Sequence, residues 1–140
     1  MKELPGDVFV TGQLLAAQMQ ALAEQGVMSF INNRPDMEGP MQPLSEELEK
    51  VAQELGVDYH HIPMAGGLTP GLIEATETAF RELPRPIVAF CASGMRSAAL
   101  WAFAHVGELG VDGVMKAISA AGYNLEQIRG PLEAHKNTSS

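Results

Sequence analysis

Short apolar segments alternate with longer segments of helical periodicity along most of this chain. Four runs are typical of strands: "DVFVTG", "VMSFI", "VDYHHIPM" and "PIVAF", at residues 7–12, 27–31, 57–64 and 86–90. Between and after them, apolar residues recur at the spacing of a helix. This order predicts an α/β fold, with a mainly parallel sheet of four to five strands and helices on both faces.

Capping residues mark several of the expected helix ends. Gly26 and Gly56 each follow a helical segment, where a left-handed residue commonly ends a helix. Ser45 is expected to cap the helix "EELEKVAQEL", and Thr69 with Pro70 is expected to begin the next one. The stretch "NNRPDMEGPMQPLS", rich in Pro, Asn and Gly, is predicted to be a long loop and a candidate for function.

With 140 residues, the chain is expected to form one domain over 1–140. The core of that domain is predicted over about 8–128, and the tail, 136–140, is expected to fray. Helices are predicted from Arg96 to Gly110, from Asp112 to Gly122, and from Asn124 onwards. The apolar helix stripe "AALWAFAHV" is predicted to be core or a subunit contact, which leaves a homo-oligomer open.

Charge and composition argue against several classes of partner. The formal charge of −8 does not fit nucleic-acid binding, which depends on clustered Lys and Arg. The chain shows no apolar run long enough to cross a membrane and no basic, apolar leader, so no membrane partner is expected. One cysteine forms no internal disulfide, and the expected location is cytoplasmic. Without clustered histidines or a nucleotide fingerprint, no metal or organic cofactor is expected.

The segment "PIVAFCASGMRSAALW" (residues 86–101) places that cysteine, Cys91, between a predicted strand and a predicted helix. Ligands collect at the carboxyl ends of strands in open parallel sheets. The first N–H groups of the helix can converge there on an anion, and Arg96 adds a planar, permanently charged fork. These neighbours are expected to lower the pKa of the thiol, so that Cys91 becomes a thiolate nucleophile. The expected anion-binding residues are Ala92, Ser93, Gly94, Met95 and Ser97.

The plainer interpretation is a buried structural cysteine followed by a glycine turn. Strand, cysteine, small residues, arginine and helix in succession favour a functional loop instead. This arrangement resembles two families, the rhodanese-type sulfurtransferases and the cysteine-dependent protein phosphatases. Rhodaneses have four residues between cysteine and arginine, and these phosphatases have five. Here there are four, which favours sulfur, because the tighter loop suits one extra sulfur atom better than a tetrahedral phosphate.

Other motifs extend the resemblance over nearly the whole chain, roughly Val8 to Ile128. In order, "TGQL", "INNRPDMEGPMQP", "HIPM" and "CASGMRSA" resemble the bacterial phosphatase-like domain of beta-lactamase-hydrolase-like proteins. That family includes members described as phosphatase-like and members described as sulfur transferases. The resemblance implies a dual-specificity-phosphatase-like α/β fold, with Cys91 as nucleophile and Arg96 as oxyanion binder. Phe90 stands where many phosphatases have His, and Ala92 where many rhodaneses have Arg.

A general acid would separate the two chemistries, because a phosphate monoester releases a group that needs a proton. Asp36 is the best candidate acid, although a turn residue bonded to local backbone is the more common role there. Glu38 is a weaker candidate. Arg34 is a candidate anion binder, and His61 a candidate at the border of the site. His60 and His61 point to opposite faces of a strand, so they do not chelate one metal.

The sequence favours a sulfurtransferase of the rhodanese type, which carries sulfane sulfur as a persulfide on Cys91. Its expected partners are a small anionic donor, thiosulfate or a low-molecular-weight persulfide, and a thiol acceptor. The alternative is a protein-tyrosine or dual-specificity-type phosphatase that forms a phosphocysteine on Cys91 and accepts aryl phosphates. A non-catalytic module that holds an oxyanion or senses redox state is the third hypothesis.

Overall fold

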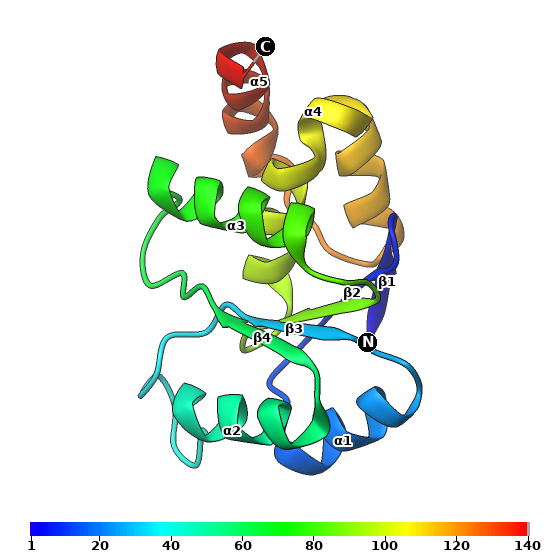
Figure 1. The fold of residues 1–140 in the computed structure, drawn as a ribbon. Coiled ribbons are helices and arrows are strands. Elements are labelled where there is room, and N and C mark those ends of the chain that lie inside the picture. The colour runs from blue at the N-terminus through cyan, green and yellow to red at the C-terminus, as the bar shows by residue number, and fades with distance from the viewer. Residues whose placement is uncertain (140) are drawn as a thin grey trace.

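A computed structural model describes residues 1–139, in which five strands form one sheet in the order β1-β2-β5-β3-β4 (Figure 1). The strands are β1 (Lys2–Leu4), β2 (Val8–Thr11), β3 (Ser29–Asn32), β4 (Asp58–His61) and β5 (Ile87–Phe90). All neighbouring strands are parallel except β1, which pairs antiparallel with β2. The four predicted strands and the parallel α/β fold are confirmed, whereas β1 was not predicted.

The register of the sheet brings three strand ends to the same place. On the central strand β5, Phe90 lies beside Thr11 of β2 and beside Asn32 of β3. Because these strands are parallel, the residues that follow them leave the sheet at one edge. Cys91 follows Phe90 directly, so the chain places it at the centre of that edge.

Helices cover both faces of the sheet, as predicted. Figure 1 shows helices below the sheet and helices above it. The helices are α1 (Ala16–Glu24), α2 (Ser45–Leu55), α3 (Pro70–Glu82), α4 (Met95–Ala120), the short 3-10 helix η1 (Glu126–Ile128) and α5 (Arg129–Ser139). Helices α1 and α2 pack against each other, while α4 packs against both α3 and α5.

Alternation along β5 divides the core into two layers. Ile87 and Ala89 point into the larger layer, under α3, α4 and α5, whereas Val88 and Phe90 point into the smaller one, under α1 and α2. All four side chains are buried, which fits a central strand of a parallel sheet. Ile87, Val88 and Phe90 each contribute about 1.5–3 kcal/mol by leaving water. The strand that carries Cys91 is therefore fixed from both sides.

Local capping explains where two of the helices begin. The Thr69 hydroxyl accepts the Leu72 N–H at 3.1 Å, as predicted for the start of α3. Ser45, in contrast, was wrongly predicted to be the cap of α2, since it is the first helical residue and its hydroxyl pairs with the Tyr59 hydroxyl. The Asp36 carboxylate accepts the Ser45 N–H at 2.8 Å and takes over the capping role from the preceding loop.

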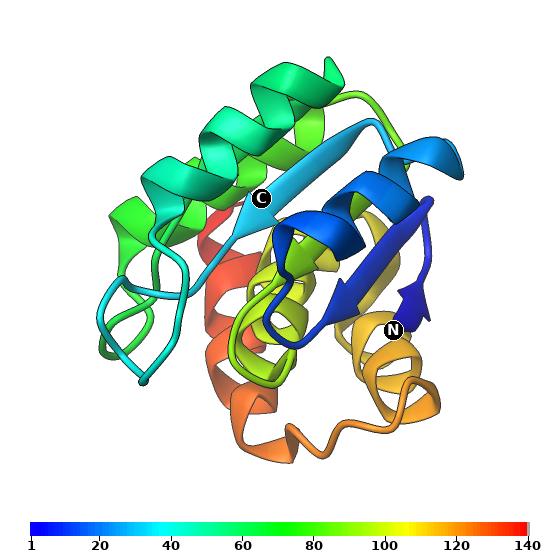
Figure 2. The same ribbon diagram turned by 90° about the horizontal axis from the view of Figure 1, so that it is seen from below.

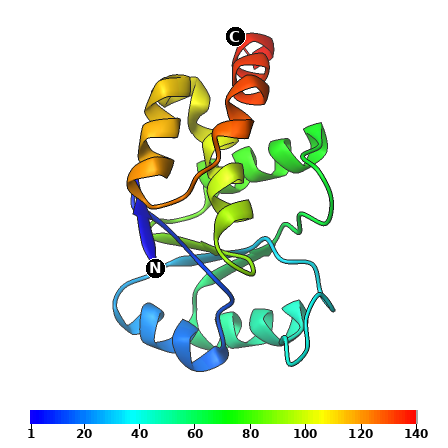
Figure 3. The ribbon, with the colours of Figure 1, turned by 180° about the vertical axis from the view of Figure 1, so that it is seen from behind.

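The segment described as α4 is two helices joined at Gly110, whose φ of 77° and ψ of 163° are not helical. Beyond that point the chain returns toward the sheet edge that carries β1 (Figure 3). This break matches the two separate helices expected from the sequence. Helix α5 continues to Ser139, so part of the tail expected to fray is helical, and residue 140 lies outside the described residues. Within residues 1–139, no helix has the length and apolar character needed to cross a membrane.

Candidate active site

The candidate site is the loop from Cys91 to Gly94, between β5 and the start of α4. Two longer loops, 33–44 and 62–69, lie at the same end of the sheet in Figure 2, where they are cyan and green. Cys91 is fully buried, and its backbone N–H bonds to the Thr11 carbonyl at 3.3 Å. Ala92, Ser93 and Met95 are exposed around it. The sulfur thus lies at the base of an open loop.

Gly94 allows the loop to curl around the sulfur. Its φ of 95° is in the left-handed region, which glycine adopts without steric cost. Its N–H donates to the Cys91 Sγ at 3.1 Å. Burial raises the pKa of the Cys91 thiol, but hydrogen bonds from the N–H groups of Ser97, Ser93 and Gly94 outweigh it, so that the pKa lies below its usual value. The predicted thiolate has its physical basis in these three N–H groups.

We expect the alkylation of Cys91 by iodoacetamide to reach half of its maximal rate at a lower pH than that of free cysteine, whose pKa is about 8.5. Only the thiolate reacts, and a lowered pKa shifts the thiolate population to lower pH. The chain has a single cysteine, so the rate measured by mass spectrometry reports this residue alone. A midpoint at or above that of free cysteine would contradict the expectation.

Arg96 lies in the first turn of α4, next to the cysteine loop. Its Nη1 donates to the Glu38 Oε2 at 2.8 Å and to the Met64 carbonyl at 3.0 Å, and its Nη2 donates to the Glu38 Oε1 at 2.9 Å. The hydrogen bond to Glu38 raises the pKa of Arg96, burial lowers it, and the nearby Cys91 raises it further. Arg96 is thus held between the carboxylate and the sulfur.

The 33–44 loop supplies this carboxylate together with a second arginine. Arg34 Nε donates to the Glu38 Oε1 at 3.1 Å, and Arg34 Nη1 donates to the Gln13 Oε1 at 3.1 Å. The hydrogen bond from Arg96 is the main cause that holds the pKa of Glu38 below its usual value, with burial opposing and Arg34 adding to it. Arg34 thus has its Nε and Nη1 engaged by Glu38 and Gln13, and its part in anion binding stays a prediction.

Ser97 links the cysteine loop to the neighbouring strand. Its hydroxyl donates to the Asn33 Oδ1 at 2.8 Å, and the Asn33 amide donates to the Ile62 carbonyl at 2.9 Å. The Ser97 side chain also contributes to lowering the pKa of Cys91, so its single hydroxyl hydrogen serves either Asn33 or the sulfur at one time. Ser97 therefore lies beside the sulfur as expected, and Asn33 anchors it in place.

Asp36 and His61 bond to parts of the chain outside the cysteine loop. The Asp36 carboxylate accepts the Ser45 N–H at the start of α2. This is a bond to local backbone, the alternative to a role as general acid. The His61 ring nitrogen Nε2 contacts the Arg34 carbonyl at 2.8 Å, so His61 borders the loop that carries Glu38. Neither the Asp36 nor the Glu38 carboxylate is free to deliver a proton in this arrangement, since one caps a helix and the other is paired with two arginines.

Tyr123 is a site residue that the sequence did not indicate. It follows α4 in the chain, yet its hydroxyl donates to the Ser93 carbonyl at 3.4 Å. Burial is the main cause that raises the pKa of Tyr123, and the charge of Cys91 adds to it. Tyr123 lies thirty residues after Ser93 and belongs to no recognisable sequence motif. Only the return of the chain after Gly110 brings it there.

These residues can hold an oxyanion above a nucleophilic sulfur. Backbone N–H groups and a fixed guanidinium face Cys91, and no three potential metal ligands of the His, Cys, Asp or Glu type gather within residues 1–139. A thiolate in such surroundings can attack a phosphorus or a sulfur atom whose oxygens the loop binds.

Two sequence comparisons match most of the chain. Residues 1–108 match the family described as the phosphatase-like domain of beta-lactamase hydrolase-like proteins. A beta-lactamase hydrolase-like protein of Agrobacterium fabrum is 36% identical over 93 residues, which are 66% of this chain and 22% of that protein. The chain therefore spans less than a quarter of that relative. The family predicted from the motifs is confirmed.

Solved structures agree with the family match. A phosphatase candidate from Neisseria meningitidis superposes with a TM-score of 0.81 at 28% identity, with 96% of each chain covered. The catalytic core of the PP-IP phosphatase Siw14 from S. cerevisiae gives a TM-score of 0.67 at 17% identity, over 94% of this chain and 82% of that one. The dual-specificity-phosphatase-like fold is thus confirmed.

Proposed function

Since the chain belongs to the phosphatase-like domain family of beta-lactamase hydrolase-like proteins, we propose that it is a cysteine-dependent phosphatase. The sequence favoured sulfur transfer, but the family match and the phosphatase fold support the alternative better. The observation that carries the proposal is the Cys91 sulfur, with its lowered pKa, under converging N–H groups and beside Arg96. We place its action in the cytoplasm, where a lone thiol stays reduced.

The proposed reaction has two steps at one sulfur. The Cys91 thiolate attacks the phosphorus of a phosphate monoester, the ester P–O bond breaks, and the leaving group departs as an alkoxide or phenolate, which takes a proton from water. The loop N–H groups and Arg96 bind the phosphoryl oxygens, on which charge is spread as the bond breaks. Water then cleaves the P–S bond of the phosphocysteine, which releases inorganic phosphate and restores the thiolate.

The placement of the carboxylates bears on the substrate class. Asp36 caps α2 and Glu38 is paired with Arg34 and Arg96, so neither stands ready to protonate a leaving group. A phenolate leaves without protonation far more easily than an alkoxide does. We therefore propose aryl phosphates as the substrates.

Comparison of aryl and alkyl phosphates tests this proposal directly. We expect kcat/KM for an aryl phosphate to exceed that for an alkyl phosphate by about 10²-fold or more, the contribution that a general acid normally makes. The same protein, assayed with thiosulfate and cyanide, should transfer sulfur more slowly than it hydrolyses the aryl ester. Sulfur transfer as the faster reaction would contradict the proposal, and turnover of neither substrate would favour a binding module.

Sulfur transfer remains the second candidate because of one feature of the loop. Only Ala92, Ser93, Gly94 and Met95 separate Cys91 from Arg96, and the sequence analysis associated this shorter spacing with a bound sulfur atom. Sulfite and thiolates also leave without a proton donor. The donor would be thiosulfate or a low-molecular-weight persulfide, with a thiol as acceptor.

A further inference from the structure

The contact between Arg96 and Glu38 joins positions that are 58 residues apart in the chain. Both carboxylate oxygens of Glu38 accept from the two terminal nitrogens of the guanidinium, at 2.8 and 2.9 Å. The Met64 carbonyl accepts a further hydrogen of Nη1 at 3.0 Å. This end-on, bidentate arrangement fixes the plane of the guanidinium as well as its position.

A count of the N–H donors of Arg96 shows which edge of its guanidinium remains for a ligand. Arginine has five N–H groups, and Glu38 and Met64 engage three of them. The remaining two, on Nε and Nη2, lie along one edge, and the Cys91 side chain is a further hydrogen-bond partner of this guanidinium. Two such parallel N–H groups match two oxygens of one oxyanion.

We infer that Glu38 is a positioning residue, which turns the Nε–Nη2 edge of Arg96 toward the oxyanion above Cys91. The inference deepens the proposed function. It rests on one part of that function, the binding of an oxyanion in the Cys91 loop. Glu38 accepts from the Nη1–Nη2 end of the guanidinium, so it leaves the Nε–Nη2 edge to the oxyanion.

The loop around Glu38 is itself fixed, as a positioning role requires. The Gln42 side chain accepts the N–H groups of Glu38 and Gly39 at 3.1 Å each, and donates to the Pro35 carbonyl at 2.9 Å. Arg34 holds the carboxylate from the other side at 3.1 Å. Since backbone and side chain are both held, the carboxylate can impose an orientation on Arg96.

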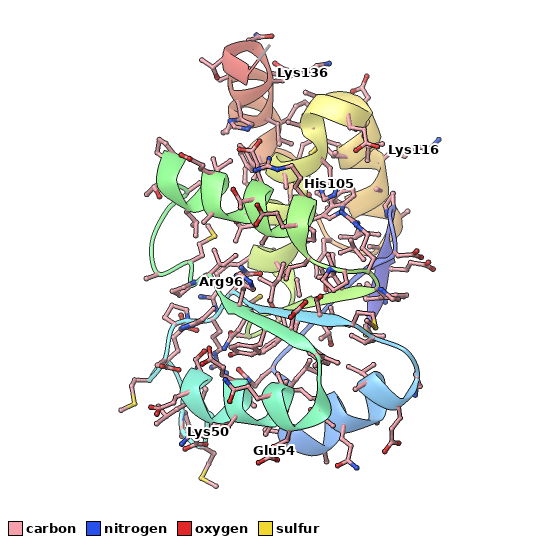
Figure 4. The ribbon with its side chains drawn as sticks, in the orientation of Figure 1. Lys50, Glu54, Arg96, His105, Lys116 and Lys136 are labelled. Carbon is pink, nitrogen blue, oxygen red and sulfur yellow. The ribbon has the colours of Figure 1, made fainter. Side chains whose placement is uncertain are left out.

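The test measures oxyanion binding without turnover. Inorganic phosphate is titrated against the wild-type protein while iodoacetamide alkylates Cys91, and the protection gives a dissociation constant. The variants are Glu38→Gln, which keeps the size and removes the charge, and Glu38→Asp, which keeps the charge and shortens the reach. Glu54→Gln is the matched control, because Glu54 lies on α2 well away from Arg96 (Figure 4).

We expect both Glu38 variants to bind phosphate about tenfold or more weakly, which corresponds to about 1.4 kcal/mol. Glu54→Gln should bind as the wild type does. Unchanged or tighter phosphate binding by Glu38→Gln would overturn the inference. Tighter binding would mean that the Glu38 carboxylate competes with phosphate for Arg96. Absence of protection in the wild type would overturn it as well. Protection without aryl phosphate turnover would instead contradict the proposed function and leave the role of Glu38 intact.

Discussion

Substitution of the nucleophile, Cys91→Ser, is expected to lower aryl phosphate hydrolysis by about 10⁴-fold or more. Serine has the same shape, but its hydroxyl does not ionise near neutral pH, so the three N–H groups no longer stabilise a reactive anion. The assay is steady-state release of the phenol, measured with enough protein to detect the residual rate.

Two controls show that Cys91→Ser removes the reaction and leaves the site. The variant should still bind inorganic phosphate, because the loop N–H groups and Arg96 are unchanged. Its free energy of unfolding should stay within about 1 kcal/mol of the wild-type value, as expected for the exchange of one modest hydrogen bond. A variant that kept a tenth of the wild-type rate would show that Cys91 is not the nucleophile.

The largest effect on folding and activity together is expected for Gly94→Ala. An added Cβ would clash with the Tyr123 hydroxyl oxygen, and the φ of 95° disfavours any residue with a Cβ. We expect the free energy of unfolding to fall by about 2–4 kcal/mol, from backbone strain plus overpacking. Hydrolysis should fall by about 10²-fold, since displacement of the loop misplaces the reacting groups.

A double variant separates these two causes. Removal of the hydroxyl in Gly94→Ala with Tyr123→Phe relieves the closest contact, so part of the lost stability should return while the cost of the positive φ remains. Gly107→Ala, in the helix that follows the loop and with nothing within 4 Å of the added Cβ, should leave stability unchanged or slightly raised. If Gly94→Ala were as stable and active as Gly107→Ala, the close packing of Tyr123 on the loop would be wrong.

The parts of the site that lie together in the sequence were predictable. Cys91, Gly94 and Arg96 fall within six residues, and the strand before them and the helix after them fix where they lie. The periodicity of apolar residues therefore gave four strands and the parallel sheet. Strand β1 escaped prediction, because three residues at an antiparallel edge are too few to show a period.

Contacts between distant segments were not predictable from local pattern. Glu38 and Arg96 meet only because β3 and β5 are neighbours, and Tyr123 reaches Ser93 only because the chain turns at Gly110. The same limit explains the error at Ser45, since capping preference identifies good residue types but not a carboxylate arriving from nine positions earlier. The spacing of Cys91 and Arg96 likewise favoured sulfur over phosphate, because the length of one loop does not show which family the whole fold belongs to.

The most direct test of the account is to trap what Cys91 carries. The wild-type protein is mixed briefly with an aryl phosphate, thiosulfate or glutathione persulfide in separate reactions, unfolded rapidly, and examined by intact-protein mass spectrometry. A phosphocysteine mechanism predicts the gain of one phosphoryl group with the aryl phosphate, which disappears in Cys91→Ser. The gain of a single sulfur atom from either sulfur donor, with no phosphoryl group from the aryl phosphate, would contradict it.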